Sequence, residues 1–245
     1  MSENIRLLNP QQEAAQHDVE YSDSSLFRLV CSIIEQNVDN PHQAHFLDVS
    51  GENASYADKL IAQYPGCFVD VVEPDSHKSS KSKQHSNKLL INKTYQQLNA
   101  LRNYDVVQFN WALHHFIAPC YEETQTLQLN ALKAAYDMLG PEGIVIIFEN
   151  FYEGKDHSNS PGKLIYQLTS SRLIKRPISQ LGARTAGVGV CFNSELYWRE
   201  QLIKAGFSSV FSAHCYDFGN LHPFKKWMLG IENQRVGMVV GIKTR

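Results

Sequence analysis

Acidic residues stand where two apolar runs end in the first third of the chain. Asp48 lies in a run that meets a turn at Ser50 and Gly51, and a second run, residues 68–72, ends in Glu73. A carboxylate at the end of a strand can accept hydrogen bonds from both hydroxyls of a ribose. Ligands of α/β proteins bind at the carboxyl ends of strands. These residues therefore predict a site for a nucleoside-bearing cofactor.

Two adjacent histidines, His114 and His115, follow another apolar run, residues 104–109. A histidine with a pKa near neutrality is the natural base for a phenol or hydroxyl. Either ring could therefore remove a proton from a substrate. The alternative interpretation is structural: His114 caps its loop through backbone hydrogen bonds, and His115 packs beside Phe116.

Further candidate pocket residues follow the ends of the same runs. Asn110 and Trp111 come directly after residues 104–109, and Glu149 and Tyr152 follow residues 143–148. Trp111 suits either a pocket or the core, because large aromatic residues at strand ends are often buried. Glu149 could orient a substrate or satisfy a helix N-terminus.

Two more candidates lie in a turn-rich and glycine-rich stretch, residues 152–192. Tyr166 is a candidate substrate contact, and Arg184 could grip an anionic substrate. A metal site is not expected. His114, His115 and Glu149 could converge, but no spacing such as HxxxH or CxxC supports metal binding.

The elements that position these residues alternate between strands and helices. Between Asp48 and Glu73 a helical face carries four apolar or aromatic residues, so strand, turn, helix and strand form one β-α-β unit. The remaining pattern predicts strands at 88–92, 104–109, 143–148, 208–214 and 236–242, and helices at 22–37, 121–139, 162–175 and 194–205. The second of these helices closes at Gly140 and Pro141, and the last closes at Gly206.

This order of elements predicts one α/β domain over residues 1–245. Residues 1–40 form an N-terminal arm and lid helix, and residues 152–192 form a cap insertion, since an insertion this long after a central strand is usually functional. The stretch between residues 214 and 235, which contains Phe224 and Trp227, is left without an assigned structure.

Composition excludes several classes of protein. A net charge of −2 gives no global field toward nucleic acid or anionic membrane. The five scattered cysteines fit a reduced chain better than a disulfide framework. No basic-then-apolar leader and no apolar run of ~20 residues is present. We therefore expect a cytoplasmic protein without a membrane partner.

The order and spacing of five motifs resemble the small-molecule branch of the class I S-adenosylmethionine-dependent methyltransferases, over roughly residues 40–245. The motifs are Leu47-Asp48-Val49, Val71-Val72-Glu73-Pro74, Tyr104-Asp105-Val106-Val107 with Ala112-Leu113-His114-His115-Phe116, Met138-Leu139-Gly140-Pro141-Glu142-Gly143, and Lys204-Ala205-Gly206-Phe207. One departure concerns the turn after the first strand, where the family has three glycines and this chain has Ser50, Glu52 and Ala54.

The resemblance implies a Rossmann-like, seven-stranded, mostly parallel sheet with helices on both faces and a reversed C-terminal strand. It also implies that S-adenosyl-L-methionine binds near Asp48, Ser50 and Gly51, with the ribose at Glu73 and the adenine near residues 92–95. Asn92 and Asn110 are the further cofactor candidates. Substrate would lie over the ends of the fourth and fifth strands.

These observations favour methyl transfer to an O or N atom of a small molecule, with secondary metabolism as one setting. A binding or scaffold protein that kept the fold and lost turnover is an alternative, favoured by Ser50, Glu52 and Ala54. A nucleic-acid methyltransferase is disfavoured because Asn110-Trp111-Ala112-Leu113 lacks the proline pair of base-modifying members. A nicotinamide dehydrogenase is disfavoured by the missing GxGxxG. A homodimer is left open.

Overall fold

The computed structural model describes residues 24–50, 55–74, 84–98, 103–171, 176, 187–217 and 221–244. Within them the chain builds a seven-stranded sheet in the order β3-β2-β1-β4-β5-β7-β6. The strands are β1 (His45–Ser50), β2 (Phe68–Val72), β3 (Lys88–Ile91), β4 (Tyr104–Asn110), β5 (Leu139–Glu153), β6 (Ser209–Asp217) and β7 (Asn233–Ile242). The helices are α2 (Ser24–Asn37), α3 (Ser55–Gln63), α5 (Tyr121–Met138), α6 (Ser160–Ser170), α8 (Glu195–Ala205) and α9 (Pro223–Leu229).

The direction of the strands confirms the predicted topology. β1 pairs in parallel with both β2 and β4, and β4 pairs in parallel with β5. β7 runs antiparallel to both of its neighbours, β5 and β6, and is the reversed C-terminal strand. The strand order reverses between β1 and β4, and open α/β sheets bind ligands at such a switch point.

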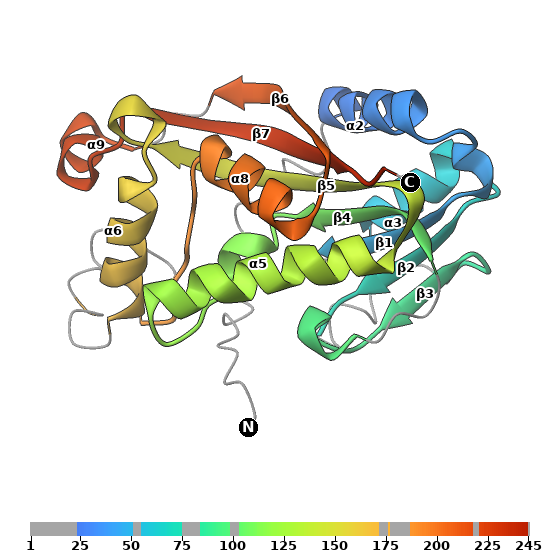
Figure 1. Cartoon of the computed structure of the whole chain (residues 1–245), viewed down its shortest axis with the longest axis horizontal. Helices are drawn as coiled ribbons and strands as arrows, with labels where there is room; N and C mark the ends of the chain where they lie inside the picture. Colours follow the sequence, from blue (N-terminus) through green and yellow to red (C-terminus); the bar gives the residue numbers. More distant parts are fainter. Residues whose placement is uncertain are drawn as a thin grey trace.

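Helices cover both faces of the sheet, because the apolar residues of each strand alternate between two cores. Ile144 and Ile146 of β5 share one core with α2 and α3, whereas Val145 and Ile147 share the other with α5 and α8. Figure 1 shows α2 on one side of the sheet and α5 with α8 on the other. The uninterrupted apolar run of β5 is thus explained by burial on both of its faces.

The strand β5 extends beyond the end of β4. The register of β4 with β5 ends at the pair of Asn110 and Phe148, whereas the register of β5 with β7 continues to Glu153 and Asn233. Residues 149–153 therefore belong to a ribbon that projects past the carboxyl edge of the parallel strands. In this ribbon β5 pairs with β7, and β6 pairs with the other edge of β7 as far as Asp217 and Arg235. Figure 1 shows α6 and α9 packed at the end of this ribbon.

Most predicted elements are confirmed, and β2 has the predicted bounds of residues 68–72. One expectation was wrong: α5 is not closed by a glycine cap at Gly140. Its C-cap is Leu139, in extended backbone, and β5 starts there without an intervening loop. The left-handed residue is instead Glu142, whose φ is 63°, inside β5 where its register with β4 shifts.

Three further outcomes concern the cap and the ends of the chain. Helix α6 begins at Ser160 and ends at Ser170, while residues 172–175 lie outside the described residues. The unassigned stretch contains α9. The predicted arm, residues 1–23, also lies outside the description. No helix within the described residues is long and apolar enough to cross a membrane.

Candidate functional site

A relay of buried polar side chains crosses the carboxyl edge of the sheet at the switch between β1 and β4. The Nδ2 group of Asn110 donates to Oδ1 of Asp48 over 2.9 Å, and Nε2 of Gln108 donates to Oδ1 of Asn110 over 2.9 Å. The hydroxyl of Tyr56, from α3, donates to Oε1 of Gln108 over 2.8 Å. All four side chains are buried. The relay fixes the orientation of Asp48 at the start of the predicted cofactor turn.

The remaining cofactor candidates surround this relay at the ends of β1, β2 and β3. Glu73 directly follows β2 and is only 3% exposed, and its backbone N–H donates to the carbonyl of Ile91 over 3.1 Å. Asn92 follows β3 and is exposed. Ser50 is the last residue of β1 and pairs with Asn110 in the register. Gly51, and with it Glu52 and Ala54, lies outside the described residues.

The chain turns sharply at Trp111, which adopts a φ of 47° in the left-handed region. This conformation is uncommon for a bulky residue and requires support from its surroundings. The indole Nε1–H donates to Oδ1 of Asn150 over 3.0 Å, and the indole packs edge-on against Phe148 at 4.2 Å. Trp111 thus lies in the core, where it holds the turn that leads from β4 to His114.

The histidine that follows this turn forms a buried pair with Glu149, the first residue of β5 beyond its pairing with β4. Nδ1 of His114 lies 2.7 Å from Oε2 of Glu149, and the backbone N–H of His114 donates to Oε1 of Glu149 over 3.3 Å. The exposed fractions of the two residues are 3% and 1%. The two candidates that the sequence analysis placed after different strands are therefore in direct contact.

Burial sets the protonation of this pair. It lowers the pKa of His114 to about 3, so the imidazole is neutral near neutral pH. With an ionised Glu149, the proton of the neutral ring resides on Nδ1 and points at the carboxylate. The lone pair is then on Nε2. A carboxylate in this position also stabilises an imidazolium that forms transiently, which is how carboxylate–histidine pairs assist proton transfer.

Aromatic rings line the neighbourhood of His114. The ring of Phe192 stacks on His114 with centroids 4.7 Å apart, and it makes a tilted contact with the ring of Tyr152 at a centroid distance of 4.8 Å. The ring centroid of His115 lies 3.9 Å from that of His114, and His115 is only partly buried. Tyr152 is therefore placed beside the histidines through Phe192, a residue that the sequence analysis did not select.

The segment that returns from the cap is attached to the turn of His114. The backbone N–H of Cys191 donates to the carbonyl of His114 over 3.0 Å. The buried side chain of Gln128, on α5, donates to the carbonyl of Leu113 over 3.0 Å and accepts from Nδ2 of Asn193 over 3.1 Å. These bonds hold the turn between α5 and the end of the cap.

The two cap candidates have different outcomes. Tyr166 of α6 is 3% exposed, and its hydroxyl donates to the carbonyl of Ala118 over 2.7 Å. It packs with Tyr121 and Cys191 in a small separate core between α6 and the start of α5, and no contact with His114 is seen. Arg184 lies outside the described residues.

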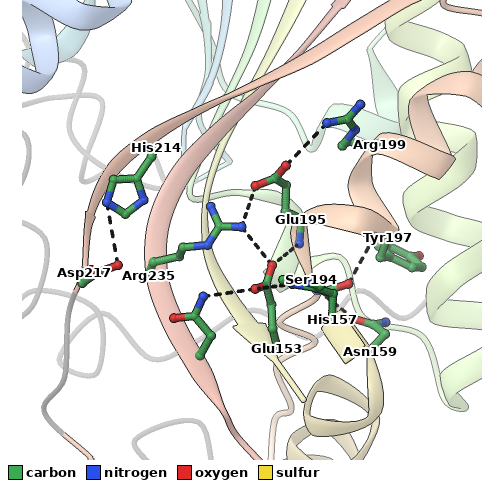
Figure 2. Close-up of polar contacts among 11 residues, drawn as sticks. Glu153, His157, Asn159, Ser194, Glu195, Tyr197, Arg199, His214, Asp217 and Arg235 are labelled. Carbon is green, nitrogen blue, oxygen red and sulfur yellow. Dashed lines mark hydrogen bonds and ion pairs between the residues drawn. The ribbon is translucent and has the colours of Figure 1, made fainter. Parts of the chain in front are cut away.

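A second polar network, centred on Glu153, fixes the far end of the ribbon (Figure 2). Nη2 of Arg235 contacts Oε1 of Glu153 at 3.0 Å and Oε2 of Glu195 at 2.5 Å. Nδ1 of His157 lies 3.2 Å from Oε2 of Glu153. Burial opposes ionisation of Glu195, but hydrogen bonds and the charge of Arg235 outweigh it and lower the pKa of Glu195. The network ties α8 and the root of the cap to β5 and β7.

The structure adds residues that sequence reasoning missed, chiefly Tyr56, Gln108, Gln128 and Phe192. Gln108 had a usable signal, because a polar residue inside an apolar strand needs a partner. Tyr56, Gln128 and Phe192 lie on elements far apart in sequence, and no sequence pattern pointed to them. No group of three or more metal-ligating side chains occurs in the described part of the chain.

Comparisons with known proteins bear on the fold of this chain. No protein-family model and no curated protein matches the chain. Among solved structures, the S-adenosylmethionine-dependent methyltransferase SibL matches with a TM-score of 0.57 at 17% identity, over 90% of this chain and 56% of SibL. A Galdieria sulphuraria protein assigned as a sarcosine dimethylglycine methyltransferase matches with a TM-score of 0.60 at 12% identity, over 98% of this chain and 92% of its own.

A third structure, PigF with S-adenosylhomocysteine (SAH), matches with a TM-score of 0.53 at 17% identity, over 86% of this chain and 53% of PigF. The chain therefore spans little more than half the length of SibL and PigF. At these identities the likeness defines the fold. The fold is that of the class I S-adenosylmethionine-dependent methyltransferases.

Proposed function

We propose that this protein transfers a methyl group from S-adenosyl-L-methionine to an O or N atom of a small molecule. The observation that carries the proposal is the buried contact of His114 with Glu149. It lies at the sheet edge where Asp48 and Glu73 are also buried. A base held by a carboxylate beside a candidate nucleoside site would serve methyl transfer to a hydroxyl, whose proton has to be removed.

The residues at the ends of β1 and β2 fit the proposed cofactor. Glu73 is a buried carboxylate at the end of the second strand, where both of its oxygens can accept from a ribose diol. Asp48 is held in a fixed orientation by Asn110, next to the turn that would take the amino-acid end. When bound, S-adenosylmethionine supplies an electrophilic methyl group on a sulfonium. The protein has to align the acceptor with it and remove a proton.

His114 is the proposed base. Nε2 takes the proton from the acceptor atom, and the charge that appears on the ring is stabilised by Glu149 at 2.7 Å from Nδ1. Phe192 and Tyr152 exclude water on one side of the imidazole. His115 is the second candidate, and its partial exposure gives it better access to a bulky acceptor.

Calorimetry of the full chain with S-adenosylmethionine and with SAH tests the cofactor part of this proposal. We expect both to bind, with dissociation constants in the micromolar range. Absence of heat with both would remove the methyltransferase proposal. Formation of SAH in the presence of panels of phenols, carboxylic acids and amines then tests the acceptor class, with secondary metabolism as the predicted setting.

Ser50, Glu52 and Ala54 in place of glycines favour a second candidate, a protein that binds without turnover. A glutamate in this turn adds bulk, and it adds a charge that repels a carboxylate if it points inward. This candidate predicts binding of SAH with no methylated product from any acceptor. The cytoplasmic location and the homodimer stay predictions.

A further inference from the structure

A polar island interrupts the apolar layer between the sheet and α3. It consists of Asp48, Tyr56, Gln108 and Asn110. Gln108 and Asn110 share the face of β4 with Val106, and that face packs against α2 and α3. Their neighbours on β5 are Ile146 and Phe148, which belong to the apolar core of the same face. The packing of this layer therefore does not by itself explain two buried amides.

The place of the island in the sheet points to the cofactor site. Buried amides cost stability unless they are hydrogen-bonded, and an apolar pair of the same shape can replace a satisfied polar pair at little cost. The island lies on β1 and β4, the strands between which the order of the sheet reverses, and Gln108 pairs with Asp48 in their register. Its polar groups therefore serve the switch point better than they serve the core.

The charge at one end of the island sets the direction of its hydrogen bonds. An ionised carboxylate only accepts, so Asn110 turns its NH2 group to Asp48, over 2.9 Å. The carbonyl oxygen of Asn110 then accepts from the NH2 group of Gln108 over 2.9 Å. The carbonyl oxygen of Gln108 in turn accepts from the hydroxyl of Tyr56 over 2.8 Å. The chain of donors thus runs from Tyr56 to the carboxylate.

The surroundings of Tyr56 keep its hydroxyl protonated and in place. Burial, with the charge of Asp48 as a further cause, raises the pKa of Tyr56 well above its ordinary value. The ring packs edge-on against Phe27 of α2, with centroids 6.0 Å apart. Tyr56 is the second residue of α3, so its hydrogen bond also ties the first turn of this helix to β4. The donor end of the chain is therefore held by two helices and the sheet.

We propose that Tyr56 is a positioning residue for the cofactor. Through Gln108 and Asn110, its hydroxyl orients the Asp48 carboxylate toward the ammonium group at the amino-acid end of S-adenosylmethionine. Hydrogen bonds in such a chain reinforce one another. Loss of the first donor lets the two amides rotate, and the carboxylate then loses its fixed orientation. The inference rests on the proposed function and adds to it a residue that acts through three hydrogen bonds.

Two ligands separate this role from a general stabilisation of the fold. SAH carries the amino-acid end, whereas 5′-methylthioadenosine has the same adenosine and sulfur without it. Tyr56→Phe should raise the dissociation constant of SAH about 3- to 10-fold, the effect of one lost hydrogen bond. It should leave the dissociation constant of 5′-methylthioadenosine at the native value. Calorimetry of the full chain measures both.

Tyr64→Phe is the matched control. Tyr64 follows α3, packs in the same core as Tyr56 and is 1% exposed. Its hydroxyl donates to Oε1 of Glu35 on α2 over 3.2 Å, and not to the island. The control should lose folding stability in urea as Tyr56→Phe does, because each variant removes a buried hydroxyl. It should bind SAH and 5′-methylthioadenosine as the native chain does.

Gln108→Met breaks the chain of donors on the sheet and leaves the side chain of Tyr56 in place. We expect it to weaken the binding of SAH, and not of 5′-methylthioadenosine, by a factor similar to that of Tyr56→Phe. Adding Tyr56→Phe to Gln108→Met should cause no further loss, because the hydroxyl then has no path to Asp48. Additive losses in the double variant would show that Tyr56 does not act through Gln108 and would overturn the inference.

The remaining outcomes distinguish the inference from the proposed function. A native chain that binds neither SAH nor 5′-methylthioadenosine would remove both. A native chain that binds both, together with a Tyr56→Phe variant that weakens the two ligands equally or weakens neither, would overturn the inference alone. A control Tyr64→Phe that loses affinity for SAH as strongly as Tyr56→Phe would also overturn it.

Discussion

Glu149 holds His114 at two points. Its Oε2 lies 2.7 Å from Nδ1 of the ring, and its Oε1 accepts the backbone N–H of the same residue. His114 lies in the turn after β4, Glu149 lies on β5, and both are buried. One carboxylate thus fixes the ring and the turn that carries it. The first prediction concerns the protonation of this ring.

The stability of the protein should depend on pH through His114. Burial lowers its pKa in the folded state to about 3, whereas the unfolded chain has the ordinary value near 6.5. Below pH 6.5 His114 therefore binds a proton in the unfolded chain but not in the folded chain. Folding stability should fall by up to about 1.4 kcal/mol for each pH unit in this window. The variant His114→Gln should lack this part of the pH dependence of folding stability.

Urea unfolding of both proteins at pH 7.5, 6.5, 5.8 and 5.0 measures the difference. His214→Gln is the control, because His214 is exposed on β6 and should leave the native dependence unchanged. A difference between the native chain and His114→Gln that stays constant over this range would show that His114 is not held neutral by burial.

Glu73→Gln should weaken the binding of SAH, because the amide can accept only one of the two ribose hydrogen bonds and loses the charge that strengthens them. We expect the dissociation constant measured by calorimetry to rise about 10- to 100-fold. Glu200→Gln on the outer face of α8 should leave it unchanged, since that side chain is 54% exposed. Equal affinity of native protein and Glu73→Gln would exclude Glu73 as the ribose ligand.

Arg235→Met should destabilise the ribbon strongly. It removes the cation between Glu153 and Glu195 while Glu153 remains 1% exposed. Loss of one member of a buried charged pair costs about 3 kcal/mol. Arg199→Met removes an exposed contact with the same Glu195, at 3.7 Å, and should cost less than about 1 kcal/mol. Guanidinium unfolding compares the two, and similar losses would mean that burial of the network does not matter.

Gly162→Ala should push α6 away from the segment that contains Phe192, whose ring stacks on His114. A Cβ at Gly162 would lie 1.9 Å from the carbonyl oxygen of Phe192, so the helix or the segment must move. Overpacking of this kind costs about 1–3 kcal/mol. Gly140→Ala is the control, because a Cβ added at Gly140 would lie 3.6 Å from its nearest neighbour, the carbonyl oxygen of Tyr104. Equal thermal unfolding of both variants would show that the cap yields at this contact without strain.

Much of the sheet could be predicted from the chain because its strands are buried on both faces. Residues 143–148 form a continuous apolar run, and burial by helices on both sides is what such a run requires. Residues 68–72 are apolar except for Asp70, which is buried and accepts from the hydroxyl of Tyr104 over 2.8 Å. The cap of α8 was also predictable, since Ser194 and Gly206 have side-chain and backbone preferences that local geometry satisfies.

The site was less predictable, because its contacts join distant positions. His114 and Glu149 were each selected, but their separation of 35 positions hides their pairing. Glycine caps fail as a signal at Gly140, since the chain needs no turn there before it enters β5. Helix α9 has helical periodicity, yet periodicity does not tell which face points inward, and here the outward face is the aromatic one.

The ribbon of residues 149–153 limits how the proposed substrate site could change. Glu149, Asn150 and Tyr152 reach beyond the parallel strands on paired β-structure rather than on a loop. Inserting a residue there would flip every following side chain to the other side of the strand. Diversification at this wall is therefore restricted to exchanging one side chain for another. Changes in length have to occur further along, in the segment after Gly154.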